Sequence, residues 1–137
     1  MAGQCAILFI GPCGRNEARL ASLRSLGFVV EERSEIPSAD ELAGYHAIVV
    51  RACGTPLTSI GARLRAKPHF GRRVLMALVR QDMAERERRE ATMGGFDLVI
   101  SEGCTARDLA SHILRLLRGY PEYRCLLRAP NGRRKAA

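Results

Sequence analysis

Three cysteines stand just after apolar runs of the chain, where they could share one site. Cys13, Cys53 and Cys104 each follow such a run by a few residues. Thiolates bind zinc and iron and are open to oxidation, so three of them side by side would form a metal centre or a redox sensor. No Cys-X-X-Cys spacing accompanies them, and no histidine is near them in sequence. Small, half-buried thiols are therefore the preferred interpretation, and a metal or redox site is an alternative.

A fixed cation ends another apolar run. Arg51 closes the segment IVVR before Gly54 and Pro56 break the chain. A long charged side chain at such a place can reach solvent, can pair with an acid, or can bind a ligand phosphate together with Arg80. All three uses are compatible with the local sequence.

Signals of an enzyme are weak. The segment GPCGRNEARL follows a strand-like run, and Glu31 lies 20 residues after Gly11, as in a dinucleotide-binding loop, but only two glycines are present and Pro12 interrupts them. Asp82 and Glu102 could approach each other as paired carboxylates, yet nothing assembles a nucleophile, a base and an oxyanion site beside them. We therefore expect no enzymatic activity and no cofactor.

Length and charge set the domain organisation. The chain has 137 residues, of which 47% are apolar and 26% charged. This length suits one domain, which we place at residues 1–119, followed by a basic C-terminal tail at residues 120–137. Of the net charge of +8, five positive charges lie in residues 118–137. Such a tail is either a frayed end or a surface for nucleic acid or another anionic partner.

The apolar segments and the cysteine count indicate the compartment. No apolar stretch approaches the roughly 20 residues that cross a bilayer, and the first apolar run is too short for the core of a signal peptide. Five cysteines without a secretion signal fit reduced thiols better than a disulfide framework. We expect a cytoplasmic protein that does not bind membranes.

Short apolar runs alternate with helix-like segments, and this alternation predicts the fold. Most runs are continuously apolar, as in parallel strands that are covered on both faces. Five strands alternating with five helices form an α/β fold, a three-layer (α/β)5 sandwich around a parallel sheet. The predicted strands are residues 5–10, 28–31, 47–51, 74–79 and 98–101, and the predicted helices are residues 16–26, a short one from Ser38, 57–65, 83–93 and one that follows Thr105.

Capping residues and apolar stripes define these helices further. Ser38 with Glu41, and Thr105 with Asp108, have the spacing of capping boxes. Residues at helical spacing are expected to face the core. These are Leu20, Leu23 and Leu26, then Leu57, Ile60 and Leu64, then Met83, Ala84, Ala91 and Met93 in the highly charged fourth helix, and finally Leu109, Ile113, Leu116 and Leu117.

Two segments resemble a known family. FVVEE after LRSLG is similar to the entry into the second strand of bacterial response-regulator receiver domains. REATMGGFDLVISEGCTARDLASHILRLLR, residues 89–118, resembles the closing segment of that family, with a helix, a Gly-aromatic-Asp turn, the fifth strand and an acid-capped last helix. The resemblance covers residues 5–118 and implies a flavodoxin-like sheet with strand order 2-1-3-4-5.

The chain departs from the family at its chemical positions. Where receivers have two acidic residues that hold magnesium, this sequence has Gly11 and Pro12. Arg51 stands in place of the phosphate-accepting aspartate. Residues 78–80, which end with Arg80, stand in place of the Ser or Thr after the fourth strand. Glu102 stands in place of the lysine after the fifth strand. The resemblance therefore implies an atypical pseudo-receiver that is not phosphorylated by the usual route.

The losses follow a pattern of swapped charges. Receivers pair an anion on the third strand with a cation after the fifth, whereas this chain has Arg51 and Glu102 at those places. The family geometry implies that the two side chains meet. We predict a salt bridge between them, with a solvent-exposed Arg51 as the alternative.

The resemblance also implies where a partner would bind. In receivers the fourth helix, fifth strand and fifth helix form the common docking and dimerisation surface. We expect a protein partner there, such as a kinase, a regulator or another signalling protein, or a homodimer. A solvated helix face, a sensor of small anions or cyclic dinucleotides that uses arginines of the strand ends or tail, and nucleic-acid binding through the tail are the alternatives. The candidate partner face comprises Arg86, Arg89, Arg107 and Arg115.

Overall fold

The sheet has the predicted topology. The computed structural model describes residues 5–11, 17–51, 56–68, 70–71 and 73–119. Within them, parallel strands form one five-stranded sheet in the order β2-β1-β3-β4-β5, which confirms the predicted receiver-like α/β fold. The strands are β1 (Ala6–Ile10), β2 (Val29–Arg33), β3 (Ala47–Arg51), β4 (Val74–Val79) and β5 (Leu98–Ser101).

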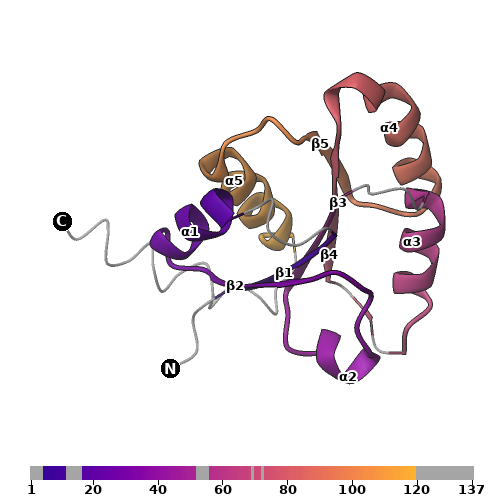
Figure 1. The fold of residues 1–137 in the computed structure, drawn as a ribbon. Coiled ribbons are helices and arrows are strands. Elements are labelled where there is room, and N and C mark those ends of the chain that lie inside the picture. Colours follow the sequence, from indigo (N-terminus) through magenta and orange to yellow (C-terminus); the bar gives the residue numbers. More distant parts are fainter. Residues whose placement is uncertain (1–4, 12–16, 52–55, 69, 72, 120–137) are drawn as a thin grey trace.

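Helices cover both faces of this sheet (Figure 1). Helices α1 and α5 lie on one face, and α2, α3 and α4 lie on the other. The Ser38–Glu41 capping box begins α2 as predicted, and the Thr105 hydroxyl accepts a hydrogen bond from the Asp108 amide at the start of α5. The helices are α1 (Glu17–Ser25), α2 (Ala39–Leu42), α3 (Leu57–Arg65), α4 (Ala84–Met93) and α5 (Ala106–Leu117), with a short 3₁₀ turn, η1 (Gln81–Met83), before α4.

Two apolar layers fill the space between the sheet and the helices. Phe9 and Met76 point to the α1 and α5 side, whereas Ile48 and Leu75 point to the α2, α3 and α4 side. Every residue of β3 and β4 is buried. This double coverage explains why these strands are continuously apolar in sequence, and it makes the charged last residue of β3 exceptional.

The charged helix α4 faces the core differently from the prediction. Ala91 is buried as predicted, but Met93, which was also predicted to face the core, is 73% exposed. Glu87, which was not predicted to face the core, is only 3% exposed. The stripe that packs against α3 and the sheet is therefore Glu87, Ala91 and Gly94, since positions three and four apart share a helix face. A Cβ atom at Gly94 would lie 2.7 Å from the Leu57 carbonyl oxygen, so the close approach of α3 selects this face.

Two smaller predictions fall at the edges of elements. Leu26, predicted to face the core, lies beyond the end of α1 and is 36% exposed. Leu116 is only partly buried, while the other three predicted core residues of α5 are buried.

The basic tail assigned to residues 120–137 lies outside the described residues. Within the described part of the chain, no helix combines the length and apolar character that spanning a membrane requires.

Candidate functional site

The predicted site positions gather at the carboxyl edge of the sheet. Gly11 follows β1, Arg51 ends β3, Arg80 follows β4 and Glu102 follows β5. Because all strands are parallel, these strand ends point to the same edge, where ligands usually bind in open α/β folds. Pro12, the other position taken from the resemblance, lies outside the described residues.

Arg51 and Glu102 form the predicted ion pair. Arg51 Nε lies 3.0 Å and Arg51 Nη2 2.9 Å from the same oxygen, Glu102 Oε2. The Arg51 side chain is 8% exposed and that of Glu102 is 26% exposed. The pair joins the ends of β3 and β5 across β4, and it confirms the salt bridge expected from the swapped charges.

Backbone contacts hold Glu102 in place for this pair. Its amide donates to the Val79 carbonyl oxygen at 2.8 Å, which extends the pairing of β4 and β5 by one residue. From the other side, Arg19 Nη2 of α1 donates to the Glu102 carbonyl oxygen. The carboxylate is thus attached to a turn that is fixed at both its amide and its carbonyl.

The backbone conformation of Gly11 and its contact with residue 51 both favour glycine at this position. Its φ is +151°, which side chains rarely adopt, and a Cβ atom there would lie 3.0 Å from Arg51 Cβ. Its amide donates to the Arg33 carbonyl oxygen at 2.9 Å, so the backbone cannot easily move away. A side chain at position 11 would therefore strain the backbone and press on the Cβ of residue 51, so the local geometry favours the glycine that stands in place of an acidic residue of receivers.

Arg80 forms a second ion pair at the same edge, with Glu87 of α4. Glu87 Oε2 accepts from Arg80 Nε at 3.0 Å and from Nη2 at 2.8 Å, while Glu87 Oε1 accepts from the Arg80 amide at 2.8 Å. The hydrogen bond and the charge of Glu87 raise the pKa of Arg80 above its ordinary value. The buried carboxylate thereby ties the end of β4 to α4.

The role of Glu87 was not predicted, because it lies within the segment AERERREA, where a solvated helix face was the preferred interpretation. Its helical spacing to Ala91 is a signal that points inward. The suggested joint use of Arg51 and Arg80 on a phosphate does not match these contacts, since each guanidinium is bound to its own carboxylate.

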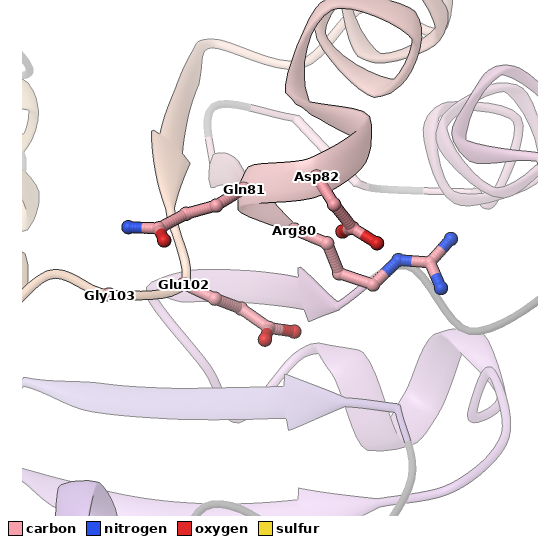
Figure 2. A pocket seen from close by; sticks show the side chains of 5 residues that line it. All are labelled: Arg80, Gln81, Asp82, Glu102 and Gly103. Carbon is pink, nitrogen blue, oxygen red and sulfur yellow. The ribbon is translucent and has the colours of Figure 1, made fainter.

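A polar cavity of about 480 Å³ lies between the turns that follow β4 and β5. Figure 2 shows Arg80, Asp82 and Glu102 extending to one side of it, whereas Gln81 points to the other. Asp82 and Glu102, which were predicted to approach each other, both line this cavity. Among the described residues, no group of three or more His, Cys, Asp or Glu could hold a metal ion.

Of the three cysteines proposed for a metal or redox site, the structure describes Cys104. Cys13 and Cys53 lie outside the described residues. Cys104 is half-buried, and this burial raises the pKa of its thiol. The thiolate is the form that binds metals and reacts with oxidants, so this environment does not activate Cys104.

The candidate partner face lies on the two helices that flank the edge strand β5 (Figure 1). Arg86 and Arg89 are exposed on α4, and Arg107 and Arg115 are exposed on α5. Arg86 pairs with Glu90 at 3.3 Å. β5 itself is only partly covered, since three of its four residues are half-buried. β5 is thus an edge strand between two helices that carry exposed arginines together with exposed acids such as Glu85 and Asp108.

Known structures with the same fold are receiver domains and response regulators. The receiver domain of a sensor histidine kinase from Pseudomonas aeruginosa, solved with magnesium in its active-site cleft, is 21% identical, with a TM-score of 0.64 over 85% of this chain and 98% of that one. An orphan response regulator of H. pylori is 17% identical, with a TM-score of 0.65 over 85% and 99%.

A third structure shares this fold. It is an atypical orphan response regulator described as having a phosphorylation-independent regulatory mechanism, and it is 19% identical, with a TM-score of 0.63 over 82% of this chain and 95% of that one. No protein-family model and no curated protein matches the chain. At these identities the likeness establishes the receiver fold.

Proposed function

We propose that the chain is a receiver-like module of two-component-type signalling that is not phosphorylated and that acts by binding a protein partner. The receiver fold supports the signalling class. The observation that carries the rest is Arg51 at the end of β3, buried and paired with Glu102. The atypical response regulator of the same fold is a precedent for regulation without phosphorylation.

The chemistry of the edge argues against phosphoryl transfer. A guanidinium has no lone pair available to accept a phosphoryl group, and it already occupies the place of the acceptor. Gly11 offers no carboxylate for magnesium, and without such a hard cation the charge that develops on the transferred group is not compensated. The carboxylate that does lie at the edge, Glu102, is bound to Arg51.

The two ion pairs also favour a single arrangement of this edge. Arg51 with Glu102 fixes the turn after β5, and Arg80 with Glu87 fixes the turn after β4. Switching requires a second arrangement that a ligand or modification can favour, and a change here would first have to separate two buried or half-buried charge pairs. The proposed module is therefore constitutive, with its partner recognising one permanent shape.

The first expected result concerns phosphorylation. Incubation of the purified protein with acetyl phosphate and Mg²⁺ leaves its intact mass unchanged, because the acceptor and the metal ligand are absent from the edge. A receiver domain that retains its aspartate, treated in the same mixture, gains a phosphoryl group and serves as the control. An acid-stable, base-labile phosphoryl adduct on any carboxylate of this chain would refute the proposal.

The second expected result concerns the partner face. Arg89, Arg107 and Arg115 are exposed on this face and make no ion pair with any described residue, so we favour a partner with an acidic surface over a second copy. The double variant Arg89→Glu/Arg107→Glu is expected to weaken binding of that partner by about tenfold or more, because each reversal places like charges opposite one another. The measurement is quantitative affinity capture from the native cytosol, followed by titration of the captured protein.

The control for that experiment is Lys67→Glu, which changes charge just beyond α3 and away from this face. Loss of the same partner with both variants would indicate a general charge effect, and unchanged binding by the double variant would exclude the surface. Arg107→Glu places an acid in the first turn of α5, where it suits the helix dipole, so the fold should tolerate it.

A further inference from the structure

Arg51 also borders a second cavity, on the side of the sheet edge away from the one in Figure 2. This hollow measures about 310 Å³ and lies between the ends of β1 and β3, the turn after β2, and α3. Arg51 lines this cavity but not the larger one, and Glu102 lines the larger one but not this one. The ion pair thus forms a wall between two separate hollows.

The ion pair leaves one hydrogen-bond donor of Arg51 without a partner. Arg51 Nη1 is buried and has no hydrogen-bond partner among the described residues. Nε and Nη2 both bind Glu102 Oε2, and in a planar guanidinium this leaves Nη1 on the side away from that carboxylate. A buried donor without a partner costs about 1–3 kcal/mol, so an acceptor placed here gains more than one at the surface.

A second cation stands at the same cavity. Arg63 of α3 lines it, is exposed, and makes no ion pair with any described residue. Glu35, in the turn after β2, is the acid of the lining. Since Glu102 already balances Arg51, the charge left over at this cavity is small, which suits a ligand with a single negative charge better than a dianion.

Three isoleucines supply the apolar part of the lining, and Ser34 and Gly11 complete it. Ile10, Ile36 and Ile60 come from β1, the turn after β2 and α3. Small-molecule sites combine apolar surface with a few directed polar groups, and the volume lies at the small end of their range, roughly 300–1,000 Å³. A carboxylate head with a short hydrocarbon body fits both halves of this lining.

We propose that this cavity binds a small monocarboxylate, whose oxygens contact Arg63 and lie beside the buried guanidinium of Arg51, and whose apolar body lies against the three isoleucines. The site lies at the ends of β1 and β3, away from the β5 edge of the sheet. It is therefore independent of whether the chain binds a partner through β5 and its flanking helices.

Isovalerate, titrated into the full-length ¹⁵N-labelled protein, tests this site. The expected result is saturable shifts of the amide signals of Gly11, Ile36 and Ile60, with no comparable shifts from its neutral isostere isovaleramide. Arg63→Gln should weaken isovalerate binding by about tenfold, as expected for loss of one charge-assisted hydrogen bond. Glu35→Gln should strengthen it by about two- to fivefold, because a nearby like charge is removed at an exposed position.

Arg107→Gln is the matched control, since it removes an exposed arginine from α5 on the opposite face of the sheet. It should leave isovalerate affinity unchanged. Absence of saturable shifts, equal shifts from the amide, or unchanged affinity in Arg63→Gln would each overturn the site. Saturable shifts from inorganic phosphate in place of isovalerate would overturn the assignment to monocarboxylates.

Discussion

Replacing Glu102 with alanine is expected to destabilise the protein by about 2–4 kcal/mol, because it leaves the guanidinium of Arg51 buried without an anion. Arg51 is 7% exposed, so water cannot readily replace the lost carboxylate. Replacing Arg51 with methionine should cost about 1 kcal/mol or less, since the apolar stem is kept and Glu102, at 26% exposure, can be hydrated. Denaturation by urea, followed by circular dichroism, measures both changes in the free energy of unfolding.

The double variant decides whether the pair acts as a unit. Arg51→Met/Glu102→Ala is expected to be about as stable as Arg51→Met alone, which corresponds to a coupling energy of about 2–4 kcal/mol, the full effect of Glu102→Ala. Both variants keep the Cβ of residue 51, so the close contact with Gly11 is not altered. Additive effects of the two substitutions would show that the ion pair contributes nothing beyond its separate side chains.

The order of elements was predictable because burial on both faces leaves a direct mark on composition. Residues 47–51, 74–79 and 98–101 were predicted as strands, and they are β3, β4 and β5 without a shift. Ser38 and Glu41 also form the predicted capping box, since that motif depends on four consecutive residues. These features are local, so one sequence is sufficient to recognise them.

The two ion pairs differ in how far they could be foreseen. Arg51 and Glu102 are 51 positions apart, and they were paired only because the resemblance to receivers places the ends of β3 and β5 together. Arg80 and Glu87 are close in sequence but were missed. The burial of Glu87 depends on the approach of α4 to α3 at Gly94 and Gly61, which nothing in the local charge pattern indicates.

The cavity beside Arg51 could not be predicted for a similar reason. Its lining comes from β1, β3, α3 and the turn after β2, and the charged members Glu35 and Arg63 have no distinctive sequence context. Only the folded arrangement places Arg63 of α3 and Arg51 of β3 on the lining of one cavity. Sites of this kind are set by the packing of separate elements, whereas the strand-end position of Arg51 is visible in the sequence alone.

Glu87→Ala is expected to destabilise the protein by about 2–4 kcal/mol, because it removes a buried carboxylate that accepts three hydrogen bonds from Arg80. The Arg80 amide loses its acceptor, and the turn between β4 and α4 loses its attachment. Glu87→Gln should have a smaller effect, since its amide oxygen can still accept from the Arg80 amide. The measurements are urea denaturation and hydrogen exchange at the Arg80 amide, which should become faster.

Glu85→Ala is the control, since Glu85 is exposed on the same helix and has no hydrogen bond to Arg80. It should shift the unfolding midpoint little and leave exchange at the Arg80 amide unchanged. Equal effects of the two alanine variants would mean that the contacts of Glu87 with Arg80 do not contribute to stability. Faster exchange in Glu87→Ala, with the Arg51–Glu102 coupling intact, would show that the two ion pairs hold separate turns, so that the constitutive shape proposed for the edge rests on two independent contacts.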